Sequence, residues 1–125
     1  MAGHPILIVD DDETSLRIAR FALEAEGFVV YQATDALSTL ETLKTVNPAV
    51  IVMDIQLPGM DGWELTRRLK ANLATCHIPI VAITAYAADS DKQNAAEAGF
   101  AAYVDKLSTT DDLPDIIRRH LQIEN

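Results

Sequence analysis

The chain has 125 residues, of which 49% are hydrophobic, so it is long enough for one globular domain with a core of its own. Its formal net charge of -9 disfavours contact with a nucleic-acid backbone, and we expect no nucleic-acid partner. Cys76 is the single cysteine, which excludes an internal disulfide and fits a reducing compartment. The sequence shows no signal peptide and no apolar run of the roughly 20 residues that a membrane helix needs, so we expect a cytoplasmic protein without membrane contact.

Strand and helix patterns alternate five times along the chain. Short apolar runs rich in Val and Ile predict strands buried on both faces, and apolar residues at helical spacing predict the helices between them. The expected strands are 6–9, 29–33, 50–54, 80–84 and 101–105. The first expected helix begins at Thr14 or Ser15 and ends at Gly27, and the others cover 36–46, 63–71, 89–98 and 112–121.

Four of the helices carry an apolar stripe that should face the sheet. The expected inward-facing residues are Ile18, Ala19, Ala22 and Leu23, then Ala36, Leu37, Leu40 and Leu43, then Leu65 and Leu69, and finally Leu113, Ile116, Ile117 and Leu121. The helix at 89–98 offers mostly alanines, so it buries little apolar area and should be loosely held. Pro114 is tolerable only in the first turn of the last helix.

This alternation predicts an α/β fold, namely a doubly wound parallel sheet of five strands with helices on both faces. The flavodoxin-like (βα)5 arrangement, with strand order 2-1-3-4-5, is the common solution for five strands. Strands one and three are then neighbours, and their carboxyl ends meet at the edge where such sheets bind ligands. Residues 1–125 are expected to form this single domain, with no output domain attached.

Polar side chains stand at the carboxyl ends of four expected strands. Asp10 and Asp11 follow the first strand, Asp54 ends the third, Thr84 ends the fourth, and Lys106 follows the fifth. Carboxylates at close range repel one another unless a cation lies between them, and hard oxygen ligands favour Mg²⁺. With Lys106 as a second positive charge and Thr84 as a hydroxyl donor, such a site suits a phosphoryl group on Asp54, whose carboxylate is the nucleophile.

The segments that carry these residues resemble the receiver domain of two-component response regulators, of the stand-alone, single-domain type. The matching segments are Ile8–Asp11, Met53–Gly62, Ile83–Ala85 and Tyr103–Lys106. The resemblance implies a phosphoacceptor regulator and not an enzyme. Asp54 would take a phosphoryl group from a histidine kinase or a histidine phosphotransfer protein, and the phosphorylated chain would then control a downstream protein target.

The resemblance also implies a metal site with defined ligands. Asp11, Asp54 and the backbone carbonyl of Gln56 would bind Mg²⁺ directly, and Asp10 would act through a water molecule. Mg²⁺ is the one cofactor expected.

Further residues take part in switching by the same resemblance. Thr84 would move toward the phosphoryl group and Tyr103 would turn inward, while Gln56 and Tyr86 would tune the lifetime of the phosphoryl group. The surface that changes would be the fourth helix, fifth strand and last helix, on a protein that is a monomer or a weak dimer.

The sequence departs from the receiver pattern at Leu107, where receivers usually have a proline preceded by a cis bond. A cis bond costs about 0.5–1 kcal/mol before proline and about 2.5–4 kcal/mol before other residues. We therefore predict a trans Lys106–Leu107 peptide and a rerouted loop before the last helix.

Two other functions are compatible with parts of the sequence. Asp10 to Thr14 fits the D-x-D-x-T start of haloacid-dehalogenase-type phosphatases, with Asp10 as nucleophile and Asp12 as acid and base, but that assignment leaves Asp54 unexplained. The departure at Leu107 fits a receiver-like interaction module that is not regulated by phosphorylation. Turnover of a small phosphate ester that is lost in Asp12→Asn would support the phosphatase, and phosphorylation of Asp54 separates the switch from the unphosphorylated module. The sequence is also compatible with a receiver excised from a larger hybrid kinase.

Overall fold

The computed structural model describes residues 3–55, 62–84, 97–105 and 109–120. Five parallel strands form one sheet in the order β2-β1-β3-β4-β5, which confirms the predicted topology. The strands are β1 (Pro5–Val9), β2 (Val29–Ala33), β3 (Val50–Asp54), β4 (Ile80–Thr84) and β5 (Ala102–Asp105). The described helices are α1 (Glu13–Ala25), α2 (Ala36–Leu43), α3 (Gly62–Ala71) and α5 (Thr109–His120).

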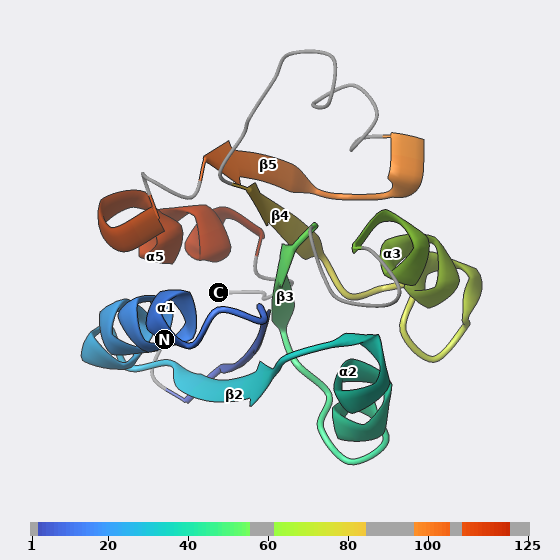
Figure 1. Ribbon diagram of the computed structural model, residues 1–125, viewed down its shortest axis with the longest axis horizontal. Helices are drawn as coiled ribbons and strands as arrows, with labels where there is room; N and C mark the ends of the chain where they lie inside the picture. The colour runs from blue at the N-terminus through green and yellow to red at the C-terminus, as the bar shows by residue number, and fades with distance from the viewer. Residues whose placement is uncertain (1–2, 56–61, 85–96, 106–108, 121–125) are drawn as a thin grey trace.

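Helices cover both faces of the sheet, with α1 and α5 on one side and α2 and α3 on the other (Figure 1). The central strands feed two apolar layers by alternation. Ile6 and Ile8 of β1 pack toward α1 and α5, while Leu7 and Val9 pack toward α2 and α3. Every residue of β3 is buried, so the two apolar layers hold this strand rigidly on both faces.

The inward face of α1 differs from the predicted one. Ala19 and Leu23 are buried as predicted, but Ile18 is exposed and the helix buries Leu16 in its place. The helix begins at Glu13 because Asp12 caps it, accepting a hydrogen bond from the Thr14 N–H. Apolar residues spaced by three and four along α1 are compatible with two neighbouring inward faces. Because α1 packs beside α5, the face that contains Leu16 is the buried one.

The inward face of α2 was predicted wrongly at two positions, because Leu37 is 72% exposed and Leu40 is 36% exposed. The helix buries Ala36 and Thr39, and Leu43 packs against the core only in part. Thr39 can be buried because its hydroxyl donates to the Asp35 carbonyl oxygen at 2.7 Å. Ala36 thus faces the sheet as predicted, and Thr39 lies there where Leu37 and Leu40 were expected.

The last helix begins at Thr109, three residues before the expected position, so Pro114 lies inside it and not in its first turn. Leu113 and Ile117 are fully buried, on either side of the proline, and fix the helix against the sheet where one backbone hydrogen bond is missing. Arg118 pairs with Glu26 just after α1, which ties the two helices of this face together.

Several predictions lie outside the described residues. These are the helix at 89–98 except for its last two residues, the Lys106–Leu107 peptide, and the inward position of Leu121. Along the parts of the chain that the structure describes, no peptide bond is cis, and no helix has the length and apolar character needed to cross a membrane.

Candidate functional site

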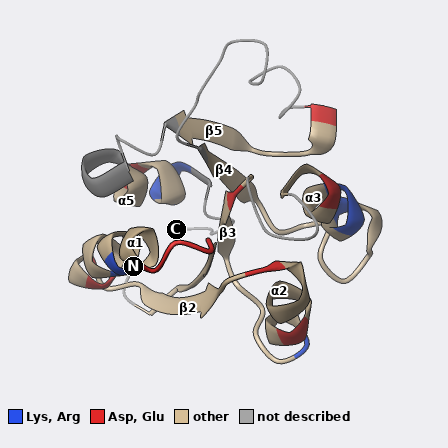
Figure 2. Cartoon of the chain, viewed as in Figure 1, with Lys and Arg blue, Asp and Glu red and all other residues tan. Residues whose placement is uncertain are grey.

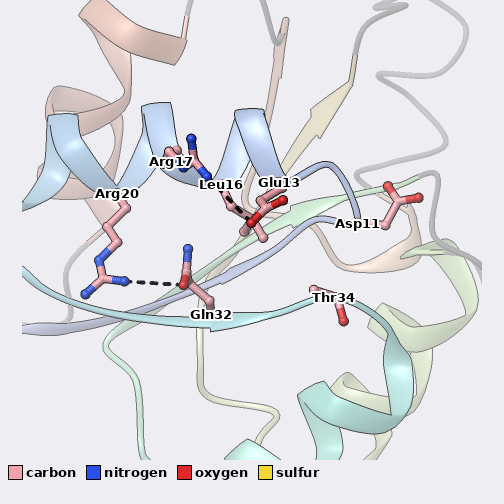
Figure 3. Close-up of a pocket in the computed structure, with 7 residues that line it drawn as sticks. All are labelled: Asp11, Glu13, Leu16, Arg17, Arg20, Gln32 and Thr34. Atoms are coloured by element: carbon pink, nitrogen blue, oxygen red, sulfur yellow. Dashed lines mark hydrogen bonds and ion pairs between the residues drawn. The ribbon is translucent and has the colours of Figure 1, made fainter.

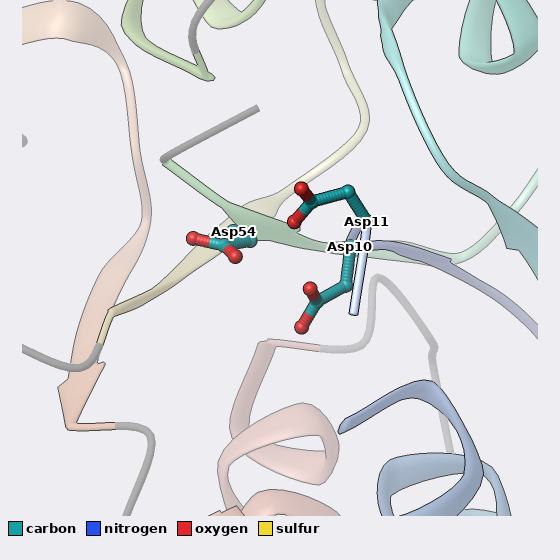
Figure 4. Close-up of side chains that lie close together, drawn as sticks. All are labelled: Asp10, Asp11 and Asp54. Atoms are coloured by element: carbon teal, nitrogen blue, oxygen red, sulfur yellow. The ribbon is translucent and has the colours of Figure 1, made fainter. Parts of the chain in front are cut away.

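Three aspartates meet at the carboxyl edge of the sheet, between β1 and β3. One carboxylate oxygen from each of Asp10, Asp11 and Asp54 lies within 4.8 Å of the others (Figure 4). Asp10 is 1% exposed and Asp54 is 6% exposed, whereas Asp11 is exposed. The strand order predicted that these carboxylates would meet, and the structure adds that two are buried while the third faces solvent.

The turn between β1 and α1 fixes Asp10. Its N–H donates to the Ala33 carbonyl oxygen at 3.1 Å, so the backbone continues the pairing of β1 with β2. Its Oδ1 atom accepts a hydrogen bond from the Asp12 N–H at 2.9 Å, and Asp12 in turn caps α1. The aspartates after β1 thus serve the turn and the helix start as well as the carboxylate cluster.

The start of α3 fixes the end of β3, where Asp54 lies. The Gly62 N–H donates to the Ile55 carbonyl oxygen at 2.9 Å. A Cβ atom on Gly62 would lie 2.6 Å from Ile55 Cα and 2.9 Å from the Asp54 carbonyl oxygen, closer than side chains approach backbone. Glycine therefore allows α3 to begin directly against the strand end that carries Asp54. The sequence indicates a helix that begins near Gly62, but it does not predict this contact.

The neighbouring strands bring other predicted residues to the same edge. Thr84 ends β4 and is paired in register with Asp105 of β5, while Asp54 is paired with Ile83. Tyr103 is partly buried and packs against the apolar layer between the sheet and α2 and α3. The predicted residues Gln56, Tyr86 and Lys106 lie outside the described residues, so their roles stay predictions.

A pocket of about 490 Å³ adjoins the cluster through Asp11 and runs between α1 and β2 (Figure 3). Its other lining residues are Glu13, Leu16, Arg17, Arg20, Gln32 and Thr34. Sequence reasoning found no signal for this pocket because α1 and β2 supply its lining from separate parts of the chain. Figure 2 shows acidic residues at the ends of β1 and β3, while the surrounding helices carry residues of both charges.

Comparison with known proteins identifies the family to which this chain belongs. The sequence matches the response regulator receiver domain family over residues 6–118, so the chain belongs to that family of signalling regulators. The polar-differentiation response regulator DivK of Brucella ovis is 32% identical over 116 residues, which are 93% of this chain and 94% of that protein.

Solved structures agree with this assignment. A CheY-like response regulator receiver domain protein from Methanospirillum hungatei is 30% identical, with a TM-score of 0.84 over 94% of this chain and 93% of that one. The receiver domain of a sensor histidine kinase from Pseudomonas aeruginosa is 29% identical, with a TM-score of 0.85 over 95% of this chain and 98% of that one. The latter structure has a magnesium ion coordinated in its active-site cleft.

Proposed function

We propose that this chain is a phosphorylation-dependent signalling switch and that Asp54 accepts the phosphoryl group. The observation that carries the proposal is the grouping of the Asp10, Asp11 and Asp54 carboxylates within 4.8 Å in a receiver domain. Asp54 alone among them stands on a strand, at the end of a β3 that is buried throughout. A nucleophile needs such a fixed position, because misplacement by an ångström lowers the rate strongly.

The donor set fits Mg²⁺, which accepts oxygen ligands and keeps several of its waters. We assign Asp11 and Asp54 as direct ligands, together with the Gln56 carbonyl that the family resemblance implies. Asp10 is held by the Asp12 N–H and acts through a water molecule. When bound, the ion supplies positive charge beside the transferring phosphoryl oxygens.

The proposed transfer needs one bond to form and one to break. A carboxylate oxygen of Asp54 forms a bond to phosphorus, and the phosphorus–nitrogen bond of a phosphohistidine breaks. The leaving imidazole nitrogen takes up a proton. The phosphohistidine belongs to a histidine kinase or a histidine phosphotransfer protein, which is the partner class that the family implies.

The proposed output is a change of surface that alters binding to a downstream protein. Thr84, Tyr103 and Lys106 are the residues that we assign to sensing the phosphoryl group, and the fourth helix, β5 and α5 form the responding surface. Support for this assignment comes from the position of Thr84 on β4, which pairs with the strand that carries Asp54, and of Tyr103 on β5, the next strand of the sheet.

Phosphorylation by a small donor tests the proposal directly. Incubation with acetyl phosphate and Mg²⁺ should add the mass of one phosphoryl group to the parent chain and none to Asp54→Asn. Asp35→Asn is the matched control, because it removes an acidic side chain that caps α2 outside the cluster. A label that persists in Asp54→Asn contradicts the acceptor assignment, and an unlabelled parent chain favours the interaction module without phosphorylation.

A further inference from the structure

The β2 strand forms one edge of the sheet and lacks the features that usually protect an edge. Its sequence Val-Val-Tyr-Gln-Ala contains no charged residue and no proline, and β-branched and aromatic residues dominate it. Val29 is 43% exposed and Tyr31 is 39% exposed. An uncharged edge of this kind is a template for pairing with another strand.

The hydrogen bonds to β1 show which backbone groups face outward. The Val29 N–H donates to the His4 carbonyl oxygen, and the Ala33 carbonyl oxygen accepts from the Asp10 N–H. Because alternate residues of a strand turn their N–H and C=O groups to opposite sides, Val30 and Gln32 turn theirs to the open edge. No described residue hydrogen-bonds these outward groups.

These two outward residues are placed symmetrically about Tyr31, which makes the edge complementary to itself. We propose that two copies of this chain pair through β2, antiparallel, about a two-fold axis at Tyr31. Val30 of each copy then exchanges both backbone hydrogen bonds with Gln32 of the other copy. The two sheets join into one continuous sheet, and the contact is isologous as in most homodimers.

The side chains on the α2 side of the sheet suit this contact. Ala33 belongs to the apolar layer under α2 and α3, so Tyr31 and Val29 point to the same side by alternation. The exposed Leu37 and Leu40 lie on α2, which covers this same face. Across the axis the two Tyr31 rings are direct neighbours, and aromatic pairs at such positions stabilise sheets.

The charges on the α1 side are complementary across the same axis. Arg20 pairs with Glu24 at 3.0 Å, and its Nη1 atom donates a hydrogen bond to Gln32 Oε1 at 3.4 Å (Figure 3). Since α1 runs antiparallel to β2, Glu24 lies toward the Val29 end of the strand. The two-fold axis exchanges the strand ends, so Arg20 of one copy faces Glu24 of the other. A second copy is therefore the occupant that the edge selects.

Reversing the charge of Arg20 or of Glu24 tests the proposal, because each variant alone should dimerise weakly and a mixture of the two should dimerise well. Sedimentation velocity at rising concentration should show a dimer for the parent chain, with a dissociation constant raised roughly tenfold in Arg20→Glu and in Glu24→Arg. Mixing the two variants should restore the dimer as a heterodimer, because each charge then meets its opposite. A parent chain that stays monomeric at all concentrations, or a dimer indifferent to these changes, overturns the proposal.

Disulfide trapping tests the register. In a Cys76→Ser background, Tyr31→Cys should cross-link two copies, because the residues at the axis form a closely spaced antiparallel pair within the reach of a disulfide. Val29→Cys is the matched control, since Val29 faces Ala33 of the other copy and should not cross-link with itself. Equal cross-linking at both positions, or none at position 31, contradicts the antiparallel pairing about Tyr31.

Discussion

Gly62 shows how one missing side chain sets the position of the Asp54 carboxylate. The residue is buried at the start of α3, and its α-carbon lies so close to the end of β3 that a Cβ would meet backbone atoms of Ile55 and Asp54. Backbone cannot yield as the end of a flexible side chain can. Any side chain at this position must therefore push α3 and β3 apart.

Gly62→Ala should lower both stability and phosphorylation. Overpacking of this kind costs about 1–3 kcal/mol in the free energy of unfolding, and displacement of Asp54 should slow acetyl phosphate labelling on the order of tenfold. Leu69→Ala is the control, because it empties a buried site about two turns further along α3 and destabilises by about 2–5 kcal/mol without moving the strand end. Equal labelling rates in folded Gly62→Ala and the parent would contradict the positioning role.

At the scale of elements, α2 depends on its first residues more than on its leucines. The Asp35 carboxylate accepts hydrogen bonds from the Ser38 N–H and the Ser38 hydroxyl, both at 2.7 Å. The Ser38 hydroxyl also accepts from the Asp35 N–H, so the two residues form a capping box. The bond from the Ser38 N–H, followed by that from its hydroxyl, lowers the pKa of the Asp35 carboxyl.

The lowered pKa of Asp35 makes the cap dependent on pH. A carboxyl whose pKa is lower in the folded state stabilises the fold above its unfolded value, about 3.9, and loses that contribution as pH falls through the folded pKa. The difference in free energy of unfolding between the parent and Asp35→Ala should thus be largest near neutral pH and shrink below about pH 4. Asp35→Asn keeps an acceptor that does not titrate, so its difference from Asp35→Ala should stay constant with pH. Urea unfolding at a series of pH values measures both, and a parent difference that does not vary with pH contradicts the titrating cap.

Strands were easier to predict from sequence than helix faces, for a physical reason. A run such as Val50–Met53 is apolar at every position, so it is a buried strand in any register. A helix face depends on which neighbour it packs against, and α2 buries Thr39 because a local hydrogen bond satisfies its hydroxyl. Periodicity counts threonine as polar and leucine as buried, so it selected Leu37 and Leu40 for the wrong face.

At the scale of the whole molecule, the strand order allowed the carboxylate cluster to be predicted without any distances. The pairing of β1 with β3 brings Asp10 and Asp11 beside Asp54 from distant parts of the chain. The close approach of Gly62 and the pocket beside Asp11 depend on atomic packing between elements, which the residue pattern does not encode. The two apolar layers of the core stabilise a fold in which the Asp10, Asp11 and Asp54 carboxylates lie close together, although they repel one another.

Magnesium should therefore stabilise the fold as a whole. The three carboxylates are assembled only in the folded chain, so binding adds to the free energy of unfolding, about 2.7 kcal/mol at a hundredfold excess over the dissociation constant. Asp11 is exposed, so Asp11→Asn should change the stability of the metal-free protein by less than about 0.5 kcal/mol while removing most of the gain from Mg²⁺. Glu13→Gln is the control, because it removes the same charge from an exposed residue next to the cluster and should keep the gain.

Thermal unfolding at constant ionic strength, with and without Mg²⁺, measures the effect. An equal rise in melting temperature for Asp11→Asn and the parent would show that the ion binds elsewhere.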